Sequence, residues 1–296
     1  MRDSFAEYHP LVNLIYFILV ISFSLVLMHP LAQAVSLVCG VIYAVSIHGR
    51  KTVSFLLKFS LPMVIMTAFI NSLFNHEGIT VLLNFPGGNP LTLESLLYGL
   101  LAGVMIVALI SWFSSFSRVM TTDKLIYLFG KIIPALSLVL SMSLRFVPKF
   151  RSQLSVVADA QRSLGRDVYS GSVLNRAKTA VHIFSVVITW ALENAVETAD
   201  SMKSRGYGLR GRTSFSLYKY EERDKYALVW LLFCGLFLIA GTMLSAFGFR
   251  YFPDIRYAAF DMTTIPFHFV FLCLCLTPVI INLKEERKWK SSASEM

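Results

Sequence analysis

Charged residues are scarce in this sequence. Only 15% of the 296 residues are charged and 55% are hydrophobic, whereas a soluble domain averages about 25% charged and about 45–50% apolar residues. This composition excludes an ordinary soluble protein and indicates a membrane protein. A transmembrane helix needs about 20 mostly apolar residues. Runs of that kind predict six membrane spans, at residues 11–28, 31–48, 53–74, 96–116, 226–248 and 264–283.

Residue patterns for metal binding and catalysis are also missing. The six histidines are scattered, with no HExxH sequence and no pair at ligand spacing, which argues against a metal site. The four cysteines lie inside apolar runs, where thiols usually act as small hydrophobic side chains. The spans contain almost no charged residue, which argues against a proton-coupled secondary transporter. The acidic residues are dispersed among basic ones, which argues against a membrane enzyme.

Lysine and arginine are almost absent from one side of the predicted topology. The connection 75–95 has neither, and of the 27 lysines and arginines only Arg250 and Arg256 belong to that side. Because basic residues favour cytoplasmic loops, this distribution predicts six spans with both termini in the cytoplasm. The net charge of +9 follows largely from the same topology. It therefore does not indicate a nucleic-acid partner.

The interval 117–225 is much longer than an ordinary connection between spans. It carries seventeen basic and nine acidic residues, and a connection of this length usually has a structure and a task of its own. We therefore divide the chain into N-terminal transmembrane helices (1–116), a cytoplasmic region (117–225) and C-terminal transmembrane helices with a basic tail (226–296). The predicted fold class is all-α, with about six transmembrane helices and two long cytoplasmic helices.

Helical periodicity marks two stretches of this region, 145–164 and 176–205, with a break at Gly171 between them. Both stretches end among basic residues on a glycine, Gly165 or Gly206, which supplies the left-handed turn that closes a helix. An arginine at such a tip can hold a partner's carboxylate through two hydrogen bonds. Ordinary capping, with cations at the negative end of the helix dipole, explains the same pattern. Two such ends in one region favour docking.

A glycine-rich stretch follows the second of these helices. Gly206–Thr213 has the spacing of a nucleotide-binding P-loop, with Arg212 in the place of the lysine. A P-loop follows a strand and opens a helix, whereas here a long helix precedes the glycines. We expect a basic tether near the lipid headgroups rather than a nucleotide site.

The run PALSLVLSMSLRFVP at 134–148 resembles a segment of the transmembrane T component of energy-coupling factor (ECF) transporters, whose relatives include cobalt and nickel permeases. The resemblance extends over about 105–210. The residues of this run that we assign as the family segment are Pro134, Leu144, Arg145, Phe146 and Pro148.

The two Ala-Arg-Gly signatures of the ECF family fall, by this resemblance, on the two predicted helix ends. The second is close, because only alanine is replaced in Ser204-Arg205-Gly206. The first departs further, because Leu164 stands where arginine is expected. We expect Arg162 or Arg166 to replace that arginine, or the contact to be apolar and the interface asymmetric. The candidate coupling residues are Arg162, Ser163, Leu164, Gly165, Arg166, Ser204, Arg205 and Gly206.

The resemblance implies a non-catalytic subunit of an ATP-driven importer in the bacterial cell membrane. Its implied partners are two ABC-type ATPase subunits, one at each helix end, a small membrane-embedded substrate-binding S component, and lipid. The chain itself is expected to bind no cofactor, since the ATPases bind ATP and Mg²⁺. The S component binds the substrate, a vitamin or a metal ion. The alternatives are a self-sufficient secondary transporter and a conventional ABC permease subunit, which has one coupling element.

Overall fold

The structure is a computed structural model that describes residues 3–49, 51–84, 90–166, 169, 172–209, 218–257 and 264–294. The chain divides into two units. Unit 1 comprises Met1–Lys124 and Tyr218–Met296, and unit 2 comprises Leu125–Leu217. Both are built almost wholly from helices in the described ranges, which confirms the predicted all-α membrane fold.

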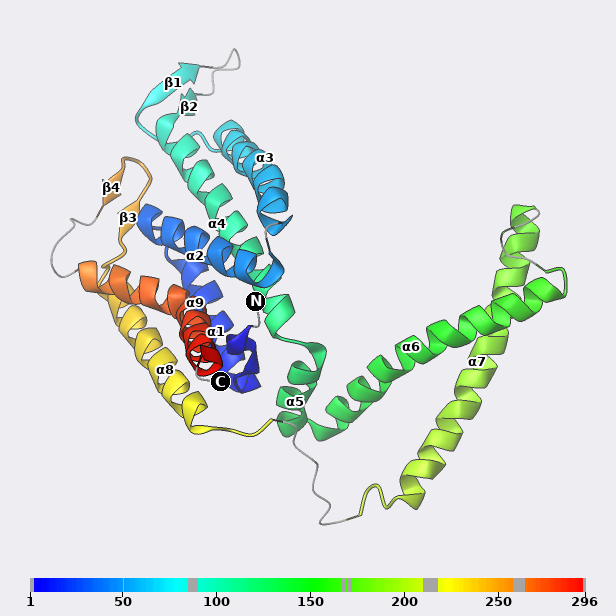
Figure 1. Cartoon of the computed structure of the whole chain (residues 1–296). Helices are drawn as coiled ribbons and strands as arrows, with labels where there is room; N and C mark the ends of the chain where they lie inside the picture. Colours follow the sequence, from blue (N-terminus) through cyan, green and yellow to red (C-terminus); the bar gives the residue numbers. More distant parts are fainter. Residues whose placement is uncertain are drawn as a thin grey trace. The chain divides into compact units, whose positions relative to one another are not determined.

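Unit 1 is a helical bundle in which α4 contacts α1, α2 and α3, while α9 contacts α2 and α8 (Figure 1). By length and composition, α2, α4, α8 and α9 can each cross a membrane, and so can α7 (Val173–Ser204) of unit 2, whereas the apolar parts of α1 and α3 are shorter. Each of the six predicted spans coincides with a helix of unit 1. The protein is therefore a multi-pass membrane protein, and unit 1 is its transmembrane part. Its helices are η1 (Ser4–Glu7), α1 (Pro10–Val26), α2 (Pro30–His48), α3 (Lys51–Phe74), α4 (Leu93–Val119), α8 (Glu222–Met243) and α9 (Ile265–Ser294).

Two short antiparallel hairpins, which the sequence did not predict, lie at one end of unit 1 (Figure 1). Strands β1 (Val81–Asn84) and β2 (Pro90–Thr92) connect α3 to α4, and β3 (Phe249–Arg250) and β4 (Arg256–Tyr257) connect α8 to α9. The Tyr251 hydroxyl, just past β3, donates to the Met28 carbonyl at 3.0 Å. This bond ties the α8–α9 connection to the turn between α1 and α2.

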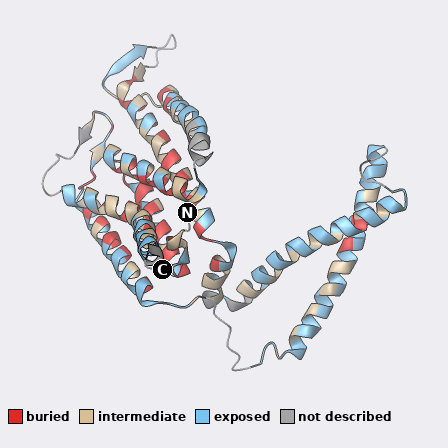
Figure 2. Cartoon of the chain, viewed as in Figure 1, coloured by how far each residue is buried: buried red, intermediate tan, exposed pale blue. Residues whose placement is uncertain are grey.

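Polar side chains bridge α1, α2 and α4 inside the bundle. The hydroxyls of Ser24 and Ser36 lie 2.6 Å apart, and Trp112 Nε1 donates to Ser36 Oγ at 3.0 Å. Gln33 Nε2 donates to the carbonyls of Ser24 and Leu27 at 2.6 and 2.9 Å. Hydrogen bonds of this kind hold helices together where lipid supplies no hydrophobic driving force between them. Buried residues accordingly gather where the helices of unit 1 face one another (Figure 2).

The N-terminal segment closes the end of unit 1 opposite the hairpins. Phe5 is fully buried, and its N–H donates to Asn282 Oδ1 of α9 at 3.0 Å. Asn282 Nδ2 donates to Asp3 Oδ1 at 2.8 Å, and the Tyr43 hydroxyl of α2 donates to Asp3 Oδ2 at 3.2 Å. The segment thus joins α2 to α9 through Tyr43, near the end of α2, and Asn282, in the middle of α9.

Lys124 anchors the chain where unit 1 meets α5 (Thr122–Ile132). Its Nζ donates to the Val119 carbonyl at 2.9 Å and to the Ala6 carbonyl. The positive charge of Lys124 also interacts favourably with the negative, C-terminal end of the α4 dipole. Burial lowers the pKa of Lys124, and the charge of Asp3 acts in the opposite direction.

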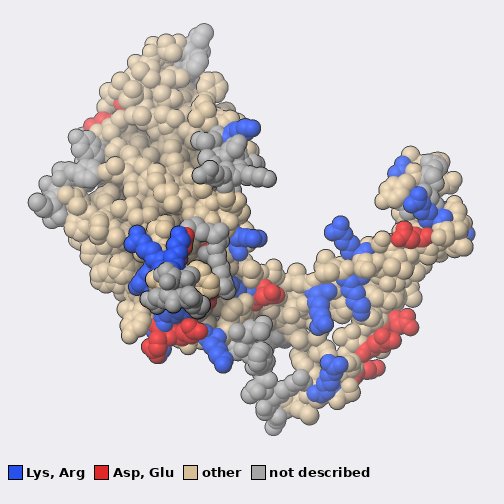
Figure 3. Space-filling model, viewed as in Figure 1, with Lys and Arg blue, Asp and Glu red and all other residues tan. Residues whose placement is uncertain are grey.

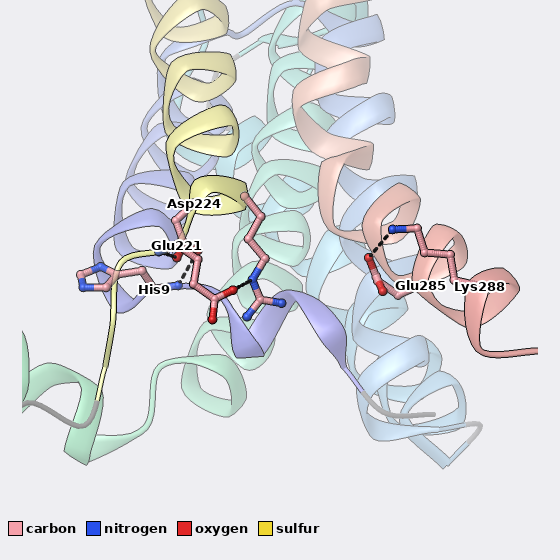
Figure 4. Close-up of polar contacts among 6 residues, drawn as sticks. His9, Glu221, Asp224, Glu285 and Lys288 are labelled. Carbon is pink, nitrogen blue, oxygen red and sulfur yellow. Dashed lines mark hydrogen bonds and ion pairs between the residues drawn. The ribbon is translucent and has the colours of Figure 1, made fainter. Parts of the chain in front are cut away.

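The first turn of α8 is held by a buried carboxylate (Figure 4). Asp224 is 1% exposed. It accepts from the His9 N–H at 3.0 Å and from the Glu221 N–H at 2.9 Å. The second bond completes a capping box, which satisfies donors that a helix start leaves without a partner. On the solvent side, Arg223 pairs with Glu221 at 2.9 Å.

Unit 2 consists of the end of α5 and two long helices, α6 (Pro134–Ser163) and α7 (Val173–Ser204). The predicted helix at 145–164 is therefore only the second half of α6, which begins at Pro134 and passes through Pro148. The prediction at 176–205 corresponds to α7. The Ser137 hydroxyl donates to the Ile126 carbonyl at 3.0 Å and so fixes the start of α6 against α5.

We predict that Gly103→Val weakens the contact between α3 and α4. A Cβ at Gly103 would lie 2.8 Å from the Val64 Cα, and one at Gly99 would lie 2.8 Å from the Ala68 Cα. Extra methyl groups in a packed interface cost about 1–3 kcal/mol. Thermal unfolding of the detergent-solubilised chain should therefore shift to lower temperature. Ser117→Val on the exposed face of α4 is the control, and equal loss in both variants would contradict the close packing.

We predict that His29 makes the stability of unit 1 depend on pH. Burial, followed by repulsion from His268, lowers the pKa of His29 from 6.5 to about 4. As pH falls from 6.5 to 4, the unfolded chain binds a proton that the folded chain does not, so stability falls across this window. His29→Asn keeps an acceptor that caps α2 and removes the titration. Its unfolding temperature should change less between pH 7 and pH 4 than that of the parent, and identical profiles would contradict the assignment.

Candidate functional site

The candidate site is built on α6 and α7, which cross within unit 2. Phe150 of α6 meets Trp190 of α7 edge to face, with ring centroids 5.9 Å apart. Lys149 Nζ donates to Asn194 Oδ1 at 3.1 Å and lies 5.4 Å from the Trp190 ring centroid. A small buried cluster completes the crossing, formed by Val157, Ile183 and Val187. These contacts fix the angle at which the two helices present their ends.

The two helices run in opposite directions at the crossing. The α6 contacts advance from Lys149 to Val157 while their α7 partners recede from Asn194 to Ile183. The end of α6 therefore lies near the start of α7, to which a short connection also joins it. The end of α7 lies at the far end of a 32-residue helix, which is about 48 Å long at 1.5 Å per residue. The two helix ends are separate sites rather than one.

The end of α6 is closed by a glycine in the left-handed conformation. Leu164 is the last half-helical residue, and Gly165 follows with φ 78°. The Gly165 N–H donates to the Arg162 carbonyl at 3.0 Å, and the Arg166 N–H donates to the Gln161 carbonyl at 3.0 Å. This pair of reversed bonds is the Schellman motif.

The end of α7 repeats the same geometry. Arg205 is the last half-helical residue, and Gly206 follows with φ 74°. The Gly206 N–H donates to the Lys203 carbonyl at 2.9 Å, and the Tyr207 N–H donates to the Met202 carbonyl at 3.0 Å. The prediction that both helices end on a left-handed glycine is therefore confirmed.

Because the two motifs are equivalent, their side chains can be compared position by position. Leu164 and Arg205 share the capping position, with φ and ψ of −87° and 9° against −84° and 10°. Arg166 corresponds to Tyr207, the residue after the glycine. Leu164 is 71% exposed and Tyr207 is 49% exposed. Each tip therefore presents an apolar side chain and a basic one, in exchanged positions.

Each tip also contains one more basic residue and one serine. Arg162 corresponds to Lys203, two residues before the cap. The Ser163 hydroxyl donates to the Asp159 carbonyl at 3.1 Å, and the Ser204 hydroxyl donates to the Ser201 carbonyl at 2.9 Å. The serines thus bond to their own helices. Their small size leaves room for a partner surface beside the larger side chains.

Charge alone does not distinguish the tips. Lysine and arginine side chains are spread along both helices of unit 2 (Figure 3). Lys178, near the start of α7 and far from its tip, is exposed to solvent, as Leu164 and Arg205 are. What distinguishes the tips is the combination of a closed helix end, a glycine and one exposed apolar side chain.

The family segment lies on α6, away from its tip. Pro134 occupies the first turn of α6, and Leu144, Arg145 and Pro148 are exposed farther along it. Phe146 stacks on Phe150 with centroids 5.8 Å apart. The segment therefore supports the crossing with α7, because Phe146 packs on Phe150, and it does not form a tip. The crossing partners Lys149, Trp190 and Asn194 were not predicted, because a contact across forty residues leaves no local pattern.

Two predictions, the break at Gly171 and the basic stretch Arg210–Thr213, concern residues that lie outside the described ranges. Within the described ranges, no group of three or more His, Cys, Asp or Glu side chains is placed to hold a metal ion.

Comparison with known proteins places most of the chain in one family. Residues 5–215 match the CbiQ family, described as cobalt transport protein. The energy-coupling factor transporter transmembrane protein EcfT of Lactobacillus helveticus is 34% identical over 121 residues, which are 40% of this chain and 44% of that protein.

Two longer alignments involve proteins of the same kind. EcfT 1 of Listeria monocytogenes is 28% identical over 217 residues, which are 68% of this chain and 77% of that protein. EcfT of Staphylococcus aureus is 29% identical over 197 residues, which are 63% of this chain and 70% of that protein. Both alignments, of 217 and 197 residues, are longer than the interval 105–210 over which the sequence resembles the ECF family.

We predict that substitution of Gly206 opens the end of α7 in proportion to the strain it introduces. Valine and alanine cost about 1–2 kcal/mol in the left-handed conformation, whereas asparagine tolerates it. Hydrogen exchange of the Tyr207 N–H should therefore quicken about 5- to 30-fold in Gly206→Ala, more in Gly206→Val, and less in Gly206→Asn. Equal exchange rates in all three variants would mean that the left-handed turn does not hold the tip.

Proposed function

The chain belongs to the CbiQ cobalt transport protein family, and from this premise we propose that it is the transmembrane coupling subunit of an ECF-type importer. In this proposal the ends of α6 and α7 each dock into one of two cytoplasmic ABC-type ATPases. Unit 1 holds the assembly in the membrane. A small S component carries the substrate.

The observation that supports this proposal is the duplication of one tip geometry on two crossed helices. Both ends are closed by the same Schellman motif, at Gly165 and Gly206. The crossing with α6 lies at Ile183 and Val187, so the end of α7 extends about 26–32 Å beyond it at 1.5 Å per residue. One groove on a single partner does not receive both. Two partner subunits, each with one groove, fit this spacing.

The chemistry of the tips supports docking that is similar but not identical at the two sites. Arg205 offers a guanidinium at the capping position, which can hold a carboxylate or backbone carbonyls through paired hydrogen bonds. Leu164 offers an apolar side chain at that position, with Arg162 and Arg166 on either side. We infer that the α6 tip inserts an apolar anchor flanked by charges, and that the interface is asymmetric.

The exposed apolar side chains of unit 2 support contact with the S component and lipid. The window of α7 that is apolar enough to cross a membrane is only 11% buried within the chain. Side chains such as Val181, Phe184 and Leu192, which are 69%, 59% and 65% exposed, are costly to leave in water. A membrane-embedded partner and surrounding acyl chains would cover them.

The chemical step belongs to the partners in this proposal. The ATPases bind ATP and Mg²⁺ and hydrolyse the nucleotide, and this chain transmits their closure to the S component. The transported substrate is a vitamin or a metal ion. The family description names cobalt transport, whereas the relatives' names specify no substrate. Both termini of the chain then face the cytoplasm, in keeping with the positive-inside rule.

We predict that Arg205→Glu strongly reduces recovery of an ATPase subunit with the tagged chain in detergent. The variant replaces a donor by a like charge against any partner carboxylate, a change that typically costs about 2–5 kcal/mol where the pair is buried. Lys178→Glu is the matched control, because it makes the same charge change at an exposed position near the other end of α7. Unchanged recovery of both ATPases with Arg205→Glu would contradict the role of this tip.

The α6 tip has its own test in the same pull-down. We predict that Leu164→Asp loses one ATPase, whereas Leu164→Arg, which recreates the family's arginine, retains it. Recovery of two ATPases and a small hydrophobic protein with the parent chain would support the whole assembly. Recovery of a homo-oligomer alone would instead favour a self-sufficient secondary transporter.

A further inference from the structure

The β1–β2 hairpin has no evident task in coupling, yet its surface is unusual. It follows α3 and leads directly into α4, where Thr92 caps the first turn by accepting from the Ser95 N–H at 3.4 Å. Its strands pair Val81 with Thr92 and Leu83 with Leu91. The apolar helix α3 precedes the hairpin, and α4, which follows it, is long and apolar enough to cross a membrane, so we place the hairpin at the membrane surface.

Both faces of strand β1 are apolar and exposed. Successive side chains of a strand point to opposite faces, and Val81, Leu82 and Leu83 are 49%, 45% and 67% exposed. A two-stranded ribbon in water normally buries one apolar face and turns polar residues outward. Here neither face is covered by the described part of the chain. The hairpin therefore suits an apolar surrounding on both sides.

The apolar surface of the hairpin continues that of α3. Phe69 and Phe74 near the end of α3 are 59% and 83% exposed, and Ile79 in the connection is 68% exposed. These α3 side chains face outward from a membrane span, where lipid is their solvent. The hairpin extends the same surface beyond the end of the helix. No lysine or arginine is drawn among the described residues at the end of unit 1 that carries β1 and β2, where red atoms form only a small patch (Figure 3).

The charges near the hairpin are few, and one of them is withdrawn into the protein. The connection 75–95 contains no lysine or arginine. Glu94 is 3% exposed, and its carboxylate accepts from the Thr80 hydroxyl at 2.8 Å and from the Thr80 N–H at 3.2 Å. Gly78, with φ 139°, permits this approach, since a Cβ there would lie 2.5 Å from Glu94 Oε2. These bonds tie the hairpin's base to α4 and keep the charge out of the surrounding lipid.

We propose that the β1–β2 hairpin is a lipid-inserted element, with Val81, Leu82 and Leu83 at the boundary between headgroups and acyl chains. The exposed edges of a two-stranded sheet have backbone groups that need water or headgroups as partners, which limits the depth of insertion. Since the segment carries no cation, its contact with the membrane is hydrophobic and does not select anionic lipids. The hairpin fixes the height of α3 and α4 in the bilayer.

Spin labels on the full chain in liposomes test this proposal. The four native cysteines are replaced by alanine, and a nitroxide is attached to Leu83→Cys or, as a second site, Val81→Cys. Oxygen collects in lipid and a nickel chelate in water, so the two relaxants report the surroundings of each label. Phe69→Cys on α3 is the lipid reference, and the exposed Glu77→Cys in the same connection is the aqueous reference.

The proposal predicts that the Leu83 and Val81 labels are more accessible to oxygen and less accessible to the nickel chelate than the Glu77 label, with values that approach those of the Phe69 label. It also predicts the same values in zwitterionic liposomes and in liposomes containing anionic lipid. Accessibility to the nickel chelate equal to that of the Glu77 label would overturn the proposal. So would protection from both relaxants, which would mean that a second copy or another protein covers the hairpin.

Discussion

Lipid supplies no hydrogen-bond partners to a polypeptide backbone, and the architecture of this protein depends on that constraint. The six α-helices of unit 1 that match the predicted spans satisfy most of their N–H and C=O groups internally, and several buried polar side chains pair across helices, as Ser36 does with Ser24 and Trp112. Where helices end, other groups take over. His9 and His29 each precede a proline and accept from the N–H two residues ahead, at 3.2 and 3.3 Å.

The same requirement at helix ends shapes unit 2. The last carbonyls of α6 and α7 are satisfied by the turn that Gly165 and Gly206 make, and Leu164 and Arg205 occupy the capping position just before each glycine. The backbone hydrogen bonds of the turn make each tip rigid. The residue at the capping position, Leu164 or Arg205, makes the two tips chemically different. Because α7 is one continuous helix, a displacement of its tip would be transmitted along the helix to the crossing with α6.

Much of the fold could be predicted from the sequence, because apolar length and helical periodicity are local signals. The spans, the two long helices and both closing glycines were predicted on that basis. Two features lacked such a signal. The hairpin escaped prediction because Val81–Leu83 is apolar on both faces and shows no alternation. The full extent of α6 escaped prediction because the predicted helix began only at Arg145. The short apolar run Ala135–Leu144 before it does not by itself indicate a helix, yet it forms the first third of α6.

The candidate tip residues were predicted from glycine placement and from resemblance, whereas their mutual equivalence needed the backbone geometry. The most direct test of the account is photocrosslinking in living cells from a reactive amino acid placed at position 164 or 205, with mass spectrometry of the products. The account predicts that each position crosslinks to an ATPase subunit, and that the two positions reach different subunits of the assembly. Crosslinks only to lipid or to a second copy of this chain would contradict it.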